Sequence, residues 1–144
     1  MDCWVEFFIA PYVESAAQVK GFGTRGAFES LPGGIYDPAV AVVEWESLLT
    51  GTGPQTLARQ GESRVVTEIT NDGGYVFVLS KRLVTSLAAA DRRRLDEVAR
   101  ERARLRREDG EDITDEEAIA HVGELAGLAR RAADQGSGLF CSVT

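Results

Sequence analysis

Cysteine is scarce in this chain, and long hydrophobic runs are lacking. Only two of the 144 residues are cysteines, Cys3 and Cys141, and their positions near opposite ends exclude a disulfide scaffold or a zinc knuckle. We expect both to be buried thiols.

No run reaches the ~18 apolar residues that a membrane-spanning helix needs, and the first four residues, Met-Asp-Cys-Trp, carry an acid where a secretion signal carries positive charge. These features predict a cytoplasmic protein without a membrane segment.

Histidine and lysine are also rare. His121 is the only histidine, and Lys20 and Lys81 are the only lysines among 16 basic residues. A zinc site or a catalytic triad would need partners for the single histidine, and the sequence predicts no metal and no cofactor. The predominance of arginine, together with abundant alanine and glycine, is typical of a protein from a GC-rich bacterial genome.

The chain has fewer basic than acidic residues. The 23 acidic residues outnumber the 16 basic ones and give a net charge of −7. An acidic surface repels phosphate groups, so this balance disfavours binding to nucleic acid or to anionic membranes. We therefore expect a basic protein as the partner, and neither nucleic acid nor membrane.

The length and composition are those of one globular domain. Hydrophobic residues make up 44% and charged residues 27% of the chain, which argues against disorder. A domain of this size buries roughly 70% of the surface that its unfolded chain exposes, which is enough for one core. Because neither an internal repeat nor a linker interrupts the sequence, residues 1–144 are predicted to form a single α+β domain.

Strand-forming residues gather at both ends of the chain. Residues 3–10 carry aromatic and β-branched side chains on alternate faces, and Pro11 ends the run. They predict a strand that is covered on both faces and internal to a sheet. A second strand is predicted over 139–143, and we expect the two terminal strands to share one sheet. Two further β-rich runs, 64–70 and 75–79, flank Asn-Asp-Gly-Gly and predict a hairpin.

Helix signals occur in four segments, over 38–50, 80–90, 91–108 and 114–134. The first follows an N-cap and a proline at Asp37-Pro38 and ends before Gly51, although its valines favour a strand. The last begins with a capping box formed by Thr114 and Glu117. The sequence therefore predicts an α+β fold with a mixed or antiparallel sheet, including both terminal strands, packed against three to four helices.

The region from 20 to 36 is rich in glycine and predicts a long loop. Residues 21–26 match the dinucleotide-binding pattern G-x-G-x-x-G, and Glu46 lies about 20 residues beyond, where such folds bind a ribose. That pattern must follow a strand directly and open a long helix, whereas Pro32 follows soon after the glycines here. A flexible loop is therefore favoured over nucleotide binding.

Five residues are candidates for binding a small ligand. Lys20, Thr24 and Arg25 lie in the glycine-rich loop, whose backbone N–H groups could join them around an anion, although solvated surface charges are favoured. Glu46 lies on the first predicted helix and His121 on the last. The five would form one site only if the fold brought these three segments together.

His121 falls at the edge of the apolar stripe of its helix. It lies four residues after Glu117 and three before Glu124, spacings at which side chains on a helix can contact each other. A boundary histidine paired with a carboxylate is favoured over a catalytic base. The predicted apolar stripe consists of Ile119, Val122, Leu125, Ala126, Ala129 and Ala133.

Arginine is concentrated in the third predicted helix, whose eight arginines suggest nucleic-acid binding. Residues 91–112 also hold eight acids, and Arg92 and Arg100 both stand at i,i+4 spacing from Asp96. We therefore favour a solvent-exposed helix face on which the acids neutralise the charge of the arginines. On the first helix, Glu44 is likewise expected to be exposed.

Several short strings resemble the YfbM-like family of small bacterial proteins of uncharacterised function. They are the aromatic strand 4–9, Leu-Leu-Thr-Gly-Thr at 48–52, the strand-to-helix entry 78–83 and the terminal string 129–139. The resemblance spans nearly the whole chain, although the loop 20–36 has no counterpart. It implies an α+β domain whose terminal strands share a sheet, and it implies no catalytic residues.

For function, acidic charge without a catalytic cluster predicts a protein-binding module, of an immunity or regulatory type, that masks a basic partner. The alternative is an enzyme, or a small-ligand or anion-binding protein, with its site at the glycine-rich loop 20–36. A third hypothesis is an interaction protein that dimerises through its helices. A structure in which Glu46, His121 and Arg25 share one pocket would favour the enzyme hypothesis.

Overall fold

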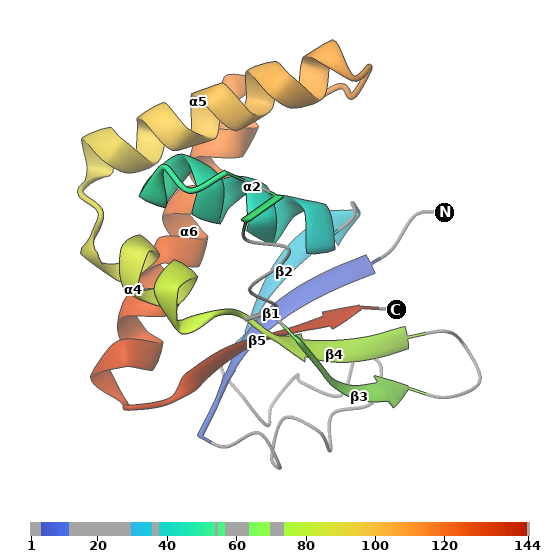
Figure 1. Ribbon diagram of the computed structural model, residues 1–144, viewed down its shortest axis with the longest axis vertical. Coiled ribbons are helices and arrows are strands. Elements are labelled where there is room, and N and C mark those ends of the chain that lie inside the picture. The colour runs from blue at the N-terminus through green and yellow to red at the C-terminus, as the bar shows by residue number, and fades with distance from the viewer. Residues whose placement is uncertain are drawn as a thin grey trace.

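An antiparallel sheet carries helices on one of its faces (Figure 1). The computed structural model describes residues 4–11, 30–35, 38–53, 55–56, 64–69 and 74–143. Within this part of the chain, the five strands are β1 (Trp4–Ala10), β2 (Ser30–Ile35), β3 (Arg64–Ile69), β4 (Gly74–Val78) and β5 (Gly138–Val143). The helices are α2 (Pro38–Thr50), α4 (Lys81–Ala89), α5 (Arg92–Glu108) and α6 (Asp115–Asp134). The fold is α+β, as predicted.

The first and last strands lie side by side at the centre of the sheet. The strand order is β2-β1-β5-β4-β3, and every neighbouring pair is antiparallel. Phe7 of β1 pairs with Cys141 of β5, which confirms that the terminal strands share one sheet. β3 and β4 pair as the predicted hairpin. Cys3 lies outside the described residues.

Alternating side chains cover β1 on both faces. Val5, Phe7 and Ile9 belong to the core beneath the helices, and none is more than 4% exposed. Phe8 packs on the opposite face against Phe140 of β5, with ring centroids 5.7 Å apart. This period of two is that of a strand, and β1 is internal to the sheet as predicted.

The predicted loop over 20–36 is wrong at its end, where residues 30–35 form the strand β2. Pro32 lies in this strand opposite Glu6, next to a shift in the pairing register. Proline has no N–H to donate, and an edge strand tolerates it because β1 is its only neighbour among the described strands. The strand therefore continues through proline and glycine, with a local irregularity in its pairing with β1. Residues 20–29 of the predicted loop lie outside the described part of the chain.

Side-chain caps start three of the helices where the sequence predicts them, whereas Asp37, the predicted cap of α2, lies outside the described residues. Ser80, Asp91 and Thr114 each accept a hydrogen bond from the backbone N–H three residues ahead, at 2.8 to 3.1 Å. Segment 38–50 is a helix rather than a strand, and Gly51 takes the positive φ of 76° that a helix C-cap favours. Start and stop signals therefore outweigh the strand preference of the valines.

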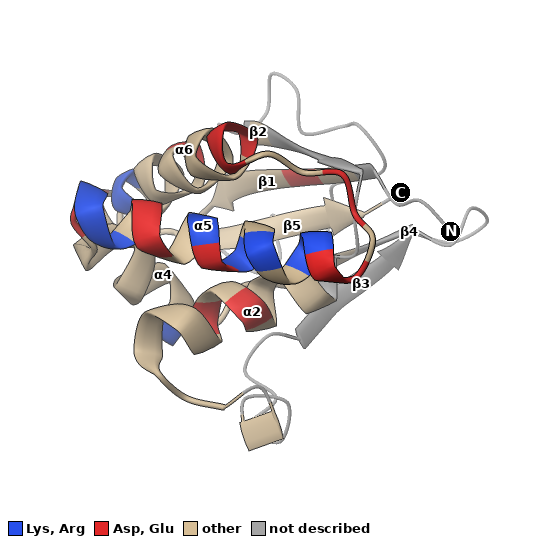
Figure 2. Cartoon of the chain, turned by 90° about the horizontal axis from the view of Figure 1, so that it is seen from above, with Lys and Arg blue, Asp and Glu red and all other residues tan. Residues whose placement is uncertain are grey.

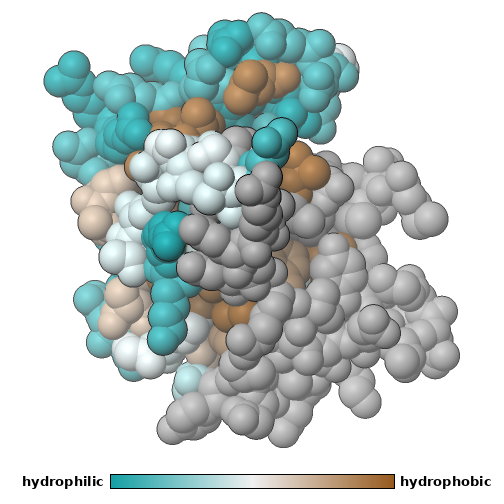
Figure 3. Space-filling view, in the orientation of Figure 1, coloured by the Kyte–Doolittle hydropathy of each residue, from teal (hydrophilic) through white to brown (hydrophobic). Residues whose placement is uncertain are grey.

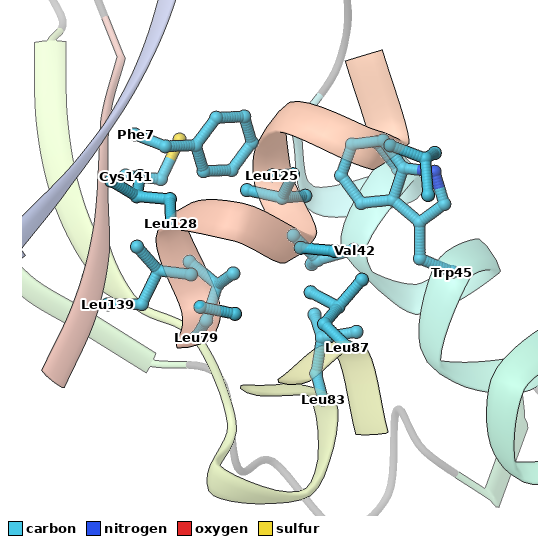
Figure 4. Packing of buried hydrophobic residues seen from close by; sticks show 14 of the residues in the cluster. Phe7, Val42, Trp45, Leu79, Leu83, Leu87, Leu125, Leu128, Leu139 and Cys141 are labelled. Carbon is cyan, nitrogen blue, oxygen red and sulfur yellow. The ribbon is translucent and has the colours of Figure 1, made fainter. Parts of the chain in front are cut away.

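The main core lies between the sheet and the helices (Figure 4). Its large, fully buried side chains include Phe7, Trp45, Leu83, Leu87 and Leu125. On α6 the predicted apolar stripe is wrong at Ala133, which is exposed, and it misses Leu128, which is buried. The reason is that α6 contacts α4 and α5 as well as the sheet, so its buried side is set by three neighbours.

Candidate functional site

Acidic residues gather at one end of the helical layer, whereas basic and acidic residues alternate along α5 (Figure 2). The start of α5 and the end of α6 carry exposed arginines: Arg92, Arg93, Arg94, Arg130 and Arg131. Where α5 turns into α6, residues 108–117 hold seven acids and no basic residue, and we name this stretch the acidic segment. All of its acids are exposed except Asp115, which is half-buried. Figure 3 shows hydrophilic residues over most of the end of the molecule built by α5.

Two arginines of α5 hold the acidic segment in place. Arg106 Nη2 lies 3.0 Å from a carboxylate oxygen of Asp109. Arg107 Nη1 donates hydrogen bonds to the carbonyl of Ile113 at 3.1 Å and to the carboxylate of Asp115 at 3.0 Å. The segment is therefore fixed near both of its ends while most of its acids face solvent.

The solvent face of α5 is neutralised from within, as predicted. Arg104 donates hydrogen bonds to Glu101 and Glu108, both at 2.6 Å. The bond from Arg104 lowers the pKa of Glu101 below its usual range. These pairs join different residues from those expected around Asp96. Because they are exposed, they contribute little to stability.

The face of α5 that packs on α2 differs from the prediction. Arg102 is only 7% exposed, and its guanidinium carbon lies 5.0 Å from the centre of the Trp45 ring. Its Nε lies 3.4 Å from Glu44 Oε1, and Arg106 Nη2 lies 3.0 Å from Glu44 Oε2. The expectation that Glu44 is exposed is wrong, because a carboxylate at this junction offsets the cost of removing two arginines from water.

His121 lies between aromatic rings at the edge of the core. Its ring centroid is 5.7 Å from that of Trp45 and 6.1 Å from that of Phe7. Burial, together with the positive charge of Arg102, lowers the pKa of His121 from 6.5 to about 4. A carboxylate partner, as the sequence predicts for His121, would instead raise the pKa of this ring. At neutral pH the ring is an uncharged, weak base, which suits a packing role better than general base catalysis.

Glu46 and His121 take part in different contacts. Glu46 is 6% exposed and accepts a hydrogen bond from the Ser80 hydroxyl, which links α2 to α4. His121 contacts Trp45, which lies about 100° around α2 from Glu46. These contacts do not bring the two predicted ligand residues together. The other three, which lie outside the described residues, are Lys20, Thr24 and Arg25.

The ligand-binding role of all five residues stays a prediction, as does the alternative of an enzyme or anion-binding site at the glycine-rich loop. Within the described residues, no three His, Cys, Asp or Glu side chains are placed to hold a metal ion. In the same part of the chain, no helix has the length and apolar character needed to cross a membrane.

Cys141 is a buried thiol, as expected, and burial raises its pKa, so it is a poor nucleophile at neutral pH.

A groove of about 640 Å³ follows the outward side of α6, between the start of α5 and β2. Its apolar and small lining residues are Leu31, Leu95, Ile119, Ala120, Gly123 and Gly127. Its charged lining residues include Arg92, Glu124 and Arg131. The sequence reasoning missed this groove. The available signal was the spacing of Ala120, Gly123 and Gly127, which places three small residues on one side of a helix.

Comparison with known proteins finds no matching protein-family model, no matching curated protein and no matching solved structure. The resemblance to the YfbM-like family therefore stays a prediction.

Proposed function

We propose that the chain is an acidic protein-binding module, of an immunity or regulatory type, that docks the acidic segment onto a basic surface of a protein partner. One observation carries the proposal: seven acids, without a basic residue among them in the sequence, gather where α5 turns into α6, and six of them are exposed. Four of these acids pair with arginines of α5, namely Glu108, Asp109, Glu111 and Asp115. The other three acids give the segment an excess of negative charge, which a cationic partner would neutralise.

Contacts within the chain tie the acidic segment to α5 and α6. Arg106 connects it to the interior, since the same guanidinium pairs with Asp109 and with the half-buried Glu44 of α2. The hydroxyl of Thr114 caps α6 and fixes the far end of the turn. A rigid charged surface loses little conformational entropy on binding, which favours affinity. Complementary charge also speeds association, and salt weakens both effects.

A pull-down with the full chain tests this proposal. The immobilised protein is incubated with the products of neighbouring genes at low and at high salt, and retained proteins are identified. We expect a basic protein to be retained at low salt and released at high salt. The double variant Glu111→Gln/Asp112→Asn removes two exposed acids from the segment and is expected to weaken retention at least severalfold.

The matched control is Glu97→Gln/Asp134→Asn, which removes the same charge from exposed positions outside the acidic segment. We expect it to retain the partner nearly as well as the unchanged chain. The proposal is wrong if no partner is retained at low salt, or if the control variant loses binding as strongly as the segment variant.

A further inference from the structure

A pocket of about 400 Å³ lies at the end of the sheet where α4 begins. The last residues of β1 and β4 meet the first residues of β5 there, and the backbone N–H of Leu79 donates a hydrogen bond of 2.9 Å to the carbonyl of Leu139. Pockets that bind small molecules usually have volumes of about 300–1,000 Å³. We name this one the Lys81 pocket, because Lys81 is its one charged lining residue within the described part of the chain.

The walls of the Lys81 pocket are mostly apolar, and neighbouring residues hold them in place. A Cβ atom added to Gly138 would lie 2.9 Å from Cε2 of Phe140, so glycine at this position leaves room for the ring. The Phe140 ring is stacked on that of Phe8, with centroids 5.7 Å apart. A preformed apolar pocket can take up the carbon chain of a ligand at little cost in conformational entropy. The apolar lining residues are Pro11, Val78, Leu79, Val84, Leu139 and Phe140.

The start of α4 carries positive charge where a helix favours negative charge. The N-terminus of a helix is the positive end of its dipole and attracts anions. The first turn of α4 nevertheless contains Lys81 and Arg82 and no acid. Lys81 is exposed, and its ammonium group forms neither a hydrogen bond nor an ion pair with the rest of the chain. An anion beside Lys81 would therefore be attracted both by the lysine and by the helix.

We infer that the Lys81 pocket binds a small organic carboxylate with an apolar tail. The carboxylate pairs with Lys81, and the tail lies against the apolar walls. One ammonium group balances the single charge of a carboxylate, whereas a phosphate ester carries a charge close to two. Thr85 and Ser137 also line the pocket, and their hydroxyl groups can donate hydrogen bonds to the carboxylate. Thr85 lies four residues after Lys81, on the same side of α4.

This ligand site does not depend on the proposed function. The Lys81 pocket and the acidic segment lie at opposite ends of α6, whose 20 residues span about 30 Å (Figure 1). A chain that binds the carboxylate but no basic partner would contradict only the proposed function. A chain that binds a basic partner but no carboxylate would contradict only the present inference.

Two-dimensional NMR of the isotopically labelled full chain tests the inference. The probe is octanoate, and its matched controls are octanol, which has the same tail without the charge, and acetate, which has the charge without the tail. We expect octanoate to shift the amide signals of residues 81–85 and 136–140 in a saturable manner. Octanol and acetate should each bind about tenfold more weakly or worse, because each lacks one of the two contributions. Octyl phosphate should bind no more tightly than octanoate.

Variants of α4 separate the two contributions. Lys81→Gln should weaken octanoate binding about tenfold and leave octanol binding unchanged. Its matched control is Arg93→Gln, in the first turn of α5, which should not affect either ligand. Thr85→Trp places a large ring at an exposed lining position and should weaken the binding of both ligands. Ala89→Trp, at an exposed position of the same helix outside the pocket, should leave both unchanged.

Several results would overturn the inference. It is wrong if octanoate leaves the amide signals around the Lys81 pocket unshifted, or if octanol or acetate binds as tightly as octanoate. It is also wrong if Lys81→Gln binds octanoate like the unchanged chain, or if Thr85→Trp does. Tighter binding of octyl phosphate would show that the pocket is not built for a carboxylate.

Discussion

Glu44 pairs with two arginines at the junction of α2 and α5. The change Glu44→Gln keeps the side-chain shape but takes the anion away from Arg102 and Arg106. Breaking a fully buried pair costs about 3–5 kcal/mol. Because Glu44 is 14% and Arg106 20% exposed, we expect a smaller loss of unfolding free energy, about 2 kcal/mol, measured by urea denaturation.

Glu97→Gln is the control for this change, because Glu97 pairs with Arg93 on the solvent face of α5. An exposed pair contributes at most about 1 kcal/mol. Equal losses for Glu44→Gln and Glu97→Gln would mean that the pairing at the helix junction does not stabilise the fold more than surface pairs do.

His121 gives the protein a pH-dependent stability of predictable sign. The folded state keeps the ring neutral down to about pH 4, whereas the unfolded chain takes up the proton below about pH 6.5. Proton uptake therefore favours unfolding, and this contribution to stability falls as the pH drops from 6.5 to about 4. Above that range the group adds no pH dependence. The total effect is at most about 3 kcal/mol.

The measurement is the unfolding free energy of the unchanged chain and of His121→Gln, at neutral pH and through the acidic range. Carboxylates titrate in both proteins, so only the difference between the two proteins reports on His121. We expect the unchanged chain to lose its advantage steadily on acidification. A difference that stays constant with pH would show that the ring is not shielded from protons in the folded state.

Ser80 joins two helices through one hydroxyl group. It donates to Glu46 of α2 and accepts from the backbone N–H of Leu83, and so caps α4. Ser80→Ala removes both bonds and takes a donor from a buried carboxylate. We expect a loss of about 2–3 kcal/mol of unfolding free energy, because a cap contributes about 1 kcal/mol and a lost bond to a buried charged group adds to it.

Asp91→Ala provides the comparison for this prediction. Asp91 caps α5 through Arg94 at an exposed position, and its loss removes a cap without disturbing the core. We expect about 1 kcal/mol, clearly less than for Ser80→Ala. Circular dichroism during chemical denaturation measures both. If the two variants lose the same stability, the bond between Ser80 and Glu46 does not tie α2 to α4.

Helices that begin and end at residues with a strong local preference were predictable from the sequence. Elements whose structure depends on contacts with residues far away in the sequence were not. Proline at position 38 and glycine at position 51 bound a helix whatever surrounds it, so α2 was found despite its valines. β2 was missed because Pro32 is acceptable only at the edge of a sheet, and edge position is a property of the whole fold. The packing of α5 on α2 and the groove along α6 likewise arise from tertiary contacts.

At the scale of the whole molecule, β5 holds the sheet together. It lies between β1 and β4, and Leu139, Cys141 and Val143 enter the core from it. A chain ending at Gln135 should lose cooperative thermal unfolding, because the sheet is left as the separate pairs β2-β1 and β4-β3. Adding a synthetic peptide of residues 136–144 should restore part of the transition, and a peptide of scrambled sequence should not. A truncated chain that melts like the full one would contradict this view.

The central position of β5 also determines when the sheet can form during folding. A ribosome releases β1 first and β5 after all the other described elements, so the pairing of Phe7 with Cys141 spans nearly the whole chain. Contacts between such distant residues close slowly. Until then the aromatic strand β1 lacks its main neighbour and offers an apolar edge to other chains. The sheet of this protein can therefore be completed only after translation has passed residue 143, and until then the growing chain presents an unpaired strand edge.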